Sequence, residues 1–175
     1  MNRNILRSGA ALVAAVLLTT LTVPAQASAG PNPGRAVQAI APPAPAAAAS
    51  LAAAPSPSIY PAVTVKYIRP DGGYGCDLDY LCALAWEPNY LWVDGQGGAR
   101  LGGWAIFYLY NCREYELSNW LGDGYYLDNQ RPAGLRGVRS YFRNQFHNQI
   151  GSYITPDGTQ HGPYDWNPVW YIKNC

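Results

Sequence analysis

Residues 104–120 read Trp-Ala-Ile-Phe-Tyr-Leu-Tyr-Asn-Cys-Arg-Glu-Tyr-Glu-Leu-Ser-Asn-Trp, the densest run of strand-forming residues in the chain. The first half of this stretch, residues 105–110, holds six consecutive apolar or aromatic residues without a glycine, a proline or a helix cap. Such a run is typical of a strand that is buried on both faces. We therefore expect a β domain whose core is built from aromatic side chains around this strand.

The ending of this run has a second copy at the C-terminus, where residues 169–175 echo residues 107–112. The echo suggests two related strands joined by their cysteines. The chain has four cysteines, which allow three pairings; they are Cys76, Cys82, Cys112 and Cys175. Cys76 and Cys82 are close enough to close a small loop, so we expect the bridges Cys76–Cys82 and Cys112–Cys175.

A zinc site is the alternative use of these cysteines, and their spacing argues against it. No C-x2-C pair occurs, and His147 and His161 are not placed as a ligand pair. We therefore expect no metal and no cofactor.

The N-terminus has the features of an export signal. Arg3 and Arg7 precede an apolar run over residues 10–23, and Ala25-Gln26-Ala27 offers a cleavage site. We predict a signal peptide at residues 1–27, a secreted protein, and no membrane contact after cleavage. A transmembrane anchor is the alternative, but the run is shorter than the roughly 20 apolar residues that a bilayer core requires.

Residues 28–59 are almost wholly Ala, Pro, Ser and Gly. Prolines remove backbone donors, and alanines offer too little apolar surface to offset the entropy cost of ordering the chain. We therefore predict a disordered spacer over residues 28–59, which is either kept as a linker or removed as a pro-segment.

The composition changes at Tyr60. All 6 Trp, 14 Tyr and 3 Phe lie in residues 60–175, which we predict to be one aromatic-rich β domain. Short β-rich runs alternate there with Gly, Pro and Asp turns, a pattern typical of an antiparallel sandwich or barrel. The predicted strands are residues 63–69, 81–86, 105–110, 137–143 and 168–172, with residues 139–149 as an alternative short helix.

The charge of the chain is close to neutral. The formal net charge is +1 and includes Arg3 and Arg7, so that the exported form carries about −1. Bulk charge therefore gives no attraction to nucleic acid or to anionic lipid. We also expect a monomer.

Three motifs occur in order: residues 76–82 (Cys-Asp-Leu-Asp-Tyr-Leu-Cys), residues 110–120, and residues 137–144 (Gly-Val-Arg-Ser-Tyr-Phe-Arg-Asn). This order resembles the Streptomyces metalloproteinase inhibitor family, and the resemblance covers about two thirds of the domain. It implies a secreted actinobacterial peptidase inhibitor with a βγ-crystallin-like, disulfide-stapled Greek-key sandwich. The calcium pattern of related crystallins fails after Asp128-Asn129, because Pro132 and Ala133 stand where hydroxyl groups are needed. We therefore expect calcium to have no effect.

An enzyme would need a constellation of catalytic groups, and none stands out. Glu114 and Glu116 would share one face of a strand, which we interpret as a solvated edge. Neither G-x-S-x-G nor H-E-x-x-H occurs. We therefore predict that the protein is not an enzyme.

Two glycine-rich turns are candidates for an inhibitory loop: residues 94–103, with Arg100 and Leu101, and residues 155–165, with Gln160 and His161. We favour the first, because Leu101 is apolar and the family resemblance implies metalloprotease targets that accept an apolar side chain after the cut bond. Its glycines count against it, since a flexible loop loses entropy on binding.

The aromatic residues support another function. Trp86, Tyr90 and Trp92 could form an exposed patch that binds cell-wall or other polysaccharide. Most of the aromatic residues are expected to fill the core instead. We thus hold two hypotheses, an inhibitor of an extracellular protease and a polysaccharide-binding module.

Overall fold

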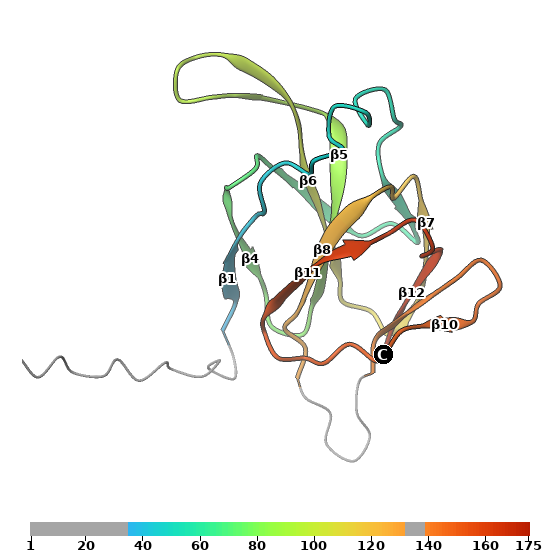
Figure 1. Ribbon diagram of the computed structural model, residues 1–175. Coiled ribbons are helices and arrows are strands. Elements are labelled where there is room, and N and C mark those ends of the chain that lie inside the picture. The colour runs from blue at the N-terminus through green and yellow to red at the C-terminus, as the bar shows by residue number, and fades with distance from the viewer. Residues whose placement is uncertain (1–34, 132–138) are drawn as a thin grey trace, which may run out of the picture.

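The computed structural model describes residues 35–131 and 139–175, and this part of the chain contains strands and turns but no helix (Figure 1). The strands are β1 (Val37–Ile40), β2 (Ser58–Tyr60), β3 (Thr64–Ile68), β4 (Gly73–Cys76), β5 (Leu81–Val93), β6 (Ala99–Leu109), β7 (Arg113–Ser118), β8 (Asp123–Asp128), β9 (Tyr141–Arg143), β10 (Gln149–Ile150), β11 (Gln160–Asp165) and β12 (Tyr171–Asn174). Their pairing is antiparallel throughout. The predicted all-β class is confirmed, and the Greek-key arrangement stays a prediction.

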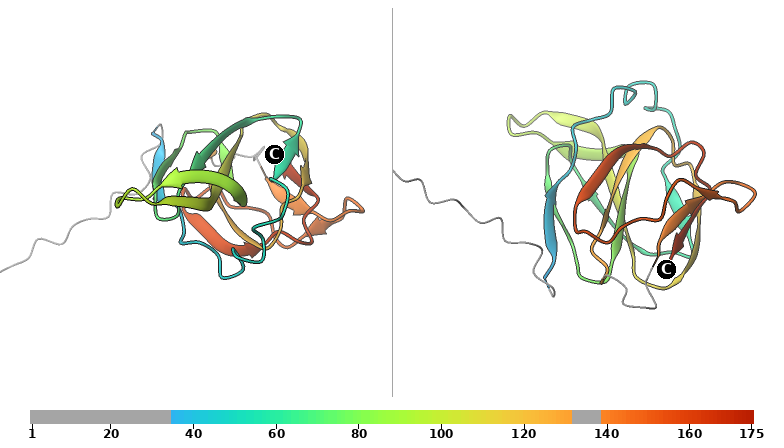
Figure 2. Two further views of the ribbon diagram at one scale, coloured as in Figure 1. Left: turned by 90° about the horizontal axis from the view of Figure 1, so that it is seen from above. Right: turned by 60° about the horizontal axis from the view of Figure 1, so that its bottom comes forward.

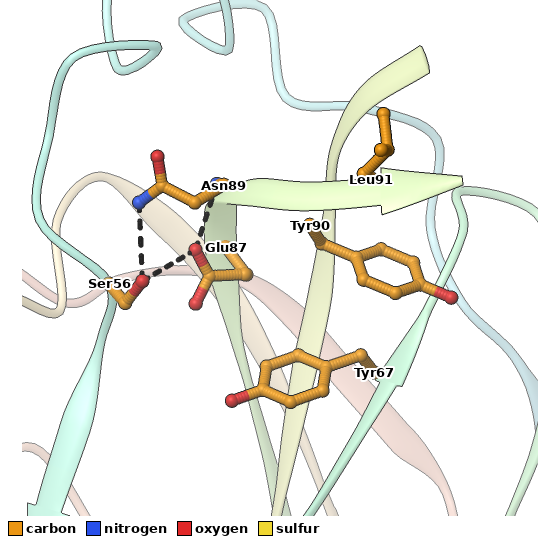
Figure 3. Close-up of a pocket in the computed structure, with 6 residues that line it drawn as sticks. All are labelled: Ser56, Tyr67, Glu87, Asn89, Tyr90 and Leu91. Atoms are coloured by element: carbon orange, nitrogen blue, oxygen red, sulfur yellow. Dashed lines mark hydrogen bonds between the residues drawn. The ribbon is translucent and has the colours of Figure 1, made fainter. Parts of the chain in front are cut away.

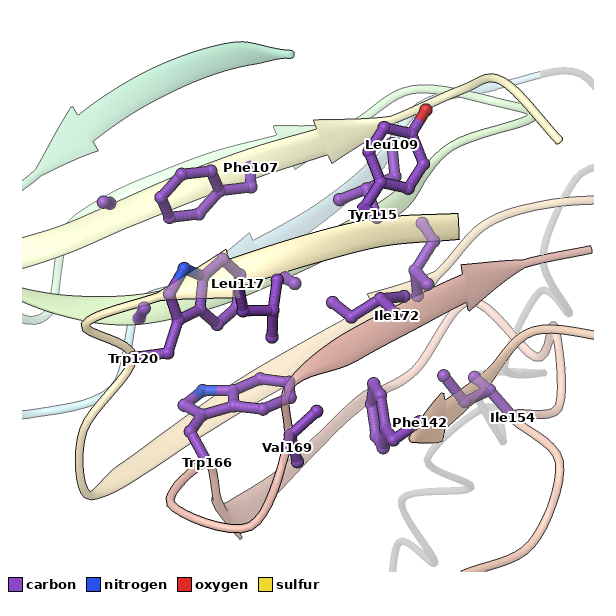
Figure 4. Packing of buried hydrophobic residues seen from close by; sticks show 14 residues of the cluster. Phe107, Leu109, Tyr115, Leu117, Trp120, Phe142, Ile154, Trp166, Val169 and Ile172 are labelled. Atoms are coloured by element: carbon purple, nitrogen blue, oxygen red, sulfur yellow. The ribbon is translucent and has the colours of Figure 1, made fainter. Parts of the chain in front are cut away.

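Two five-stranded sheets make up the body. Their strand orders are β10-β9-β12-β7-β2 and β11-β8-β5-β6-β3, and β1 with β4 forms a separate two-stranded sheet. Side chains from both five-stranded sheets meet in the first core, among them Phe107 on β6, Tyr115 on β7 and Ile172 on β12 (Figure 4). The two sheets therefore pack face to face, as in a β-sandwich.

A second core lies on the opposite face of β5 and β6. It includes Leu84, Trp86, Trp104 and Ile106, whereas Phe107 belongs to the first core. Successive side chains of a strand point to opposite faces, so residues 104–109 feed both cores and are all buried. The prediction of a strand buried on both faces is confirmed for residues 105–109, whereas Tyr110 lies beyond β6 and is 57% exposed.

The segment predicted to be a disordered spacer covers this second core. β1 pairs with β4 and β2 pairs with β7. Between β1 and β2, Ala41 is buried, and the Trp104 indole Nε1 donates a hydrogen bond of 2.8 Å to the Pro42 carbonyl oxygen. The spacer prediction is wrong from residue 35 onward, because the backbone of this segment finds partners on strands far along the chain. The predicted signal peptide and residues 28–34 lie outside the described residues.

Both predicted disulfides are present. Cys76–Cys82 has a Cα–Cα distance of 6.0 Å and joins β4 to β5 within the second core. Cys112–Cys175 has a Cα–Cα distance of 5.1 Å and ties the turn between β6 and β7 to the C-terminus. The two strands that echo each other in sequence, β6 and β12, belong to different sheets.

Residues 141–150 form the β9–β10 hairpin instead of a short helix. The Asn144 side-chain Oδ1 accepts hydrogen bonds of 3.0 Å from the backbone N–H groups of Phe146 and Asn148. His147 has a φ of 60°, in the left-handed region. These features form a tight turn at residues 144–148, so the chain cannot continue as a helix there.

Candidate functional site

β5 and β6 extend beyond their sheet as a two-stranded arm (Figure 1, Figure 2). β8 pairs with β5 only as far as Leu84, and β3 pairs with β6 only from Trp104 onward. Further out, residues 91–93 pair with residues 99–101, and neither segment has a second strand neighbour among the described residues. We call residues 91–101 the hairpin arm.

One face of the hairpin arm is apolar and exposed. Leu91 and Val93 are two positions apart on β5, and Leu101 lies directly opposite Leu91, so all three side chains share this face. They are 63%, 64% and 71% exposed. Exposed apolar residues usually occur singly on a monomer, and a cluster marks a surface for a partner.

The tip of the hairpin arm is ordered by one carboxylate. Asp94 Oδ1 accepts hydrogen bonds from the backbone N–H groups of Gly98 at 2.7 Å and Gln96 at 3.0 Å, and Arg100 Nε lies 2.9 Å from Asp94 Oδ2. The hydrogen bond from Gly98, then those from Arg100 and Gln96, hold the pKa of Asp94 below its usual value. The glycines of the tip therefore belong to a hydrogen-bonded turn.

The predicted loop at Arg100 and Leu101 is thus a strand. Both residues lie on β6, where Arg100 is opposite Trp92. Leu101 is exposed at this position of the strand. The prediction of a loop is wrong here because only residues 94–98 form the turn between the two strands.

The predicted aromatic patch is not formed as expected. Trp86 is buried in the second core and packs edge-on against Trp104, with ring centroids 5.3 Å apart. Tyr90 and Trp92 are half-buried, and Trp92 Nε1 donates a 2.8 Å hydrogen bond to the Gly102 carbonyl oxygen. Residues 86–92 continue β5 through an irregularity between Glu87 and Leu91 instead of forming a turn, which places Trp86 inside.

The other candidate loop, residues 155–165, is largely a strand. Gln160 begins β11, which pairs with β8. His161 stacks on Tyr126 with ring centroids 5.2 Å apart, and His161 Nε2 lies 3.0 Å from Asp157 Oδ2. These contacts hold this segment against the sheet, so it does not project as the hairpin arm does.

The acidic pair on β7 does not lie at an edge of the sheet. β7 has β12 on one side and β2 on the other. Glu116 is exposed, as predicted, but Glu114 is partly buried and lies 2.6 Å from Arg143 Nη1 and 2.9 Å from His147 Nδ1. The prediction of a solvated edge is wrong, because Glu114 pairs with side chains of the β9–β10 hairpin.

A pocket of about 260 Å³ opens at the base of the hairpin arm (Figure 3). Its lining residues are Ser56, Tyr67, Glu87, Asn89, Tyr90 and Leu91. Glu87 is only 4% exposed, and its Oε1 accepts hydrogen bonds of 2.8 Å from Ser56 Oγ and from the Asn89 backbone N–H. The sequence alone does not single out Glu87, because Ser56, in the loop before β2, and Tyr67, on β3, line the same pocket from distant parts of the chain.

Residues 35–131 and 139–175 contain no group of three or more His, Cys, Asp or Glu side chains arranged to hold a metal ion. No helix in these described ranges has the length and apolar character needed to cross a bilayer. The two disulfides are compatible with an extracellular protein. Comparisons of the chain with protein-family models, with curated proteins and with solved structures found no match.

Proposed function

We propose that the protein is a secreted peptidase inhibitor that presents the hairpin arm to the active-site cleft of an extracellular protease. The resemblance of its sequence motifs to metalloproteinase inhibitors favours a metalloprotease target. The observation that supports the proposal best is the hairpin arm itself, which projects from a disulfide-stapled body and carries three exposed apolar side chains.

The backbone of the hairpin arm suits a cleft that binds extended peptides. Residues 99–101 are paired with β5 on one side and have no strand on the other side within the described structure. A partner can add to such an edge by main-chain hydrogen bonds while its pockets accept alternate side chains. Leu101 is the side chain best placed for such a pocket.

The order of the tip also favours tight binding. Asp94 fixes the turn through Gly98, Gln96 and Arg100 before any partner arrives. A segment that is already ordered loses less entropy on association, which leaves more of the contact energy as affinity. The glycines of the tip therefore do not make the hairpin arm flexible, which was the argument against this segment.

The contribution of Leu101 can be bounded. Burial of a whole leucine side chain is worth about 1.5–3 kcal/mol, and Leu101 is 71% exposed, so its burial in a cleft would contribute about 1–2 kcal/mol. Aspartate at this position would lose that term and would place an unpaired charge in the interface. We therefore expect Leu101→Asp to weaken inhibition by about 100-fold or more.

The test is to titrate the secreted protein into metalloprotease and serine protease assays, as the parent, as Leu101→Asp and as Phe146→Asp. Phe146 is 72% exposed in the β9–β10 turn, so its substitution introduces the same charge at an equally exposed site away from the hairpin arm. Leu101→Asp should lose inhibition while keeping the melting temperature of the parent, and Phe146→Asp should inhibit normally.

Equal inhibition by Leu101→Asp and the parent would show that the hairpin arm is not the inhibitory element. A parent that inhibits neither class of protease but is retained by insoluble cell wall would replace this proposal with a polysaccharide-binding function.

A further inference from the structure

The pocket at the base of the hairpin arm contains a buried acid without a cationic partner. Glu87 is 96% buried, and none of the ion pairs among the described residues includes it. Both of its hydrogen bonds, from Ser56 and Asn89, end on Oε1. Buried charges in proteins are normally paired, so an unpaired carboxylate that lines a pocket points to a ligand.

The second carboxylate oxygen of Glu87 is free for that ligand. Oε2 accepts no hydrogen bond within the part of the chain that the structure describes. Figure 3 shows this oxygen turned away from Asn89, on the side of the pocket where Tyr67 lies. A donor that enters the pocket can therefore reach it without breaking the existing bonds.

Two aromatic rings form another wall of the pocket. Tyr67 and Tyr90 stack with ring centroids 5.8 Å apart and an angle of 21° between their planes. An aromatic face attracts a cation through its quadrupole, and it also packs against the methylene groups of a side chain. A carboxylate beside such rings thus recognises a positive charge at the end of an apolar stem.

We propose that this pocket binds an organic cation, an ammonium or guanidinium group that pairs with Glu87 and packs against Tyr67 and Tyr90. The volume of about 260 Å³ lies just below the range of sites for drug-sized ligands, about 300–1,000 Å³, and so suits one basic side chain or a small amine. A neutral sugar could also stack on the rings, but it would leave the charge of Glu87 uncompensated.

This inference does not rest on the inhibitory function. The pocket binds its cation whether or not the hairpin arm enters a protease, so each proposal can fail alone. If both hold, a lysine or arginine of the partner protein is the group that enters the pocket when the arm docks.

The test is an NMR titration of the disulfide-bonded protein, followed at the backbone N–H of Asn89, which bonds directly to Glu87. The probes are N-acetyl-arginine amide for a protein side chain, putrescine for a free amine, N-acetyl-citrulline amide as the neutral match of arginine, and a neutral glucan oligosaccharide. Shifts that saturate with either cation but not with citrulline support the proposal. The cation that binds identifies its source.

The variants remove the charge and the ring separately. Glu87→Gln keeps an oxygen that accepts from Ser56 and Asn89 but loses the charge, and it should weaken cation binding by about tenfold or more. Glu116→Gln makes the same charge change on an exposed position of β7 and should bind as the parent does. If Glu87→Gln does not fold, Tyr67→Ala, which truncates a half-exposed ring, takes its place with the same expectation.

Three results would overturn the proposal: citrulline binding as well as arginine, undiminished cation binding by the Glu87 or Tyr67 variant, or no shift with either cation. Saturable binding of the oligosaccharide alone would identify a sugar site instead.

Discussion

Asp128 on β8 should control how the stability of the protein depends on pH. The residue is 1% exposed, its Oδ2 has no hydrogen-bond partner among the described residues, and its Oδ1 accepts one from the Gln130 backbone N–H at 3.0 Å. The pKa of Asp128 is raised from 3.8 to about 6, mainly by burial. The hydrogen bond from Gln130 lowers this pKa, the nearby charge of Asp157 raises it, and His161 lowers it. Its charged form is therefore disfavoured in the folded protein.

The size of the effect follows from the two pKa values. The folded pKa of about 6 exceeds the unfolded value of 3.8, so the folded state holds the proton more tightly. The stabilising contribution is complete below about pH 3.8 and is lost as the pH rises through about 6. A pKa difference of one unit between the folded and unfolded states corresponds to about 1.4 kcal/mol. From well below pH 3.8 to well above pH 6, the free energy of unfolding should therefore fall by about 3 kcal/mol because of this residue alone.

The assay is urea unfolding of the disulfide-intact protein between pH 4 and pH 7.5, for the parent, Asp128→Asn and Asp123→Asn. Asparagine keeps an oxygen that accepts from Gln130 but does not titrate. Asp123 is an exposed acid on the same strand and serves as the matched control. The stability of Asp128→Asn relative to the parent should rise by about 2.5 kcal/mol across this range, whereas that of Asp123→Asn should stay nearly constant. A difference for Asp128→Asn that stays constant within about 0.5 kcal/mol would refute the reasoning.

Two further predictions concern the packing. A protein that begins at residue 57 loses β1 and uncovers Trp104. It should therefore melt at least several degrees lower than a protein that begins at residue 35, and it should bind a hydrophobic dye. Equal melting of the two would contradict the role given to residues 35–56. Gly124→Ala should lower the free energy of unfolding, measured with urea, by about 3 kcal/mol or more, because the added methyl group would overlap the Trp166 indole nitrogen and the Leu84 carbonyl oxygen. Gly95→Ala adds its methyl group in open space and should leave the stability nearly unchanged. A neutral Gly124→Ala would show that Trp166 can move aside.

The parts of the fold that sequence patterns predicted are those in which the local signal is strong. The run at residues 105–110 has no polar interruption, and residues 105–109 of it form a strand between two cores, whereas Tyr110 lies beyond the end of β6. The disulfides followed from the close spacing of Cys76 and Cys82, which left one pair for the remaining cysteines. In both cases a single stretch of sequence carried the information.

The failures have a common physical cause. Residues 35–59 have the composition of a linker, and they are ordered by backbone hydrogen bonds to β4 and β7 that composition does not reveal. Pro88 and Asn89 are turn formers, yet they lie at an irregularity inside a long strand, which tolerates a proline. At both places contacts with distant parts of the chain overrode the local sequence preference. The irregular strand also places Trp86 in the second core instead of in an exposed turn.

The two proposed sites depend on these tertiary partners to different degrees. The tip of the hairpin arm is held by Asp94 and Arg100, which are close in sequence, so its candidate residues could be found from the sequence. The pocket joins Ser56, from the supposed spacer, to Glu87 on β5 and Tyr67 on β3, a combination that only the fold creates. Loss of residues 35–56 would therefore remove Ser56 from the proposed cation pocket while leaving the hydrogen bonds of the tip in place. The shortened protein should keep any inhibition that depends on Leu101 and should bind cations at Glu87 more weakly, because Glu87 loses the hydrogen bond from Ser56 and becomes more accessible to water. One change to the chain thus separates the two sites.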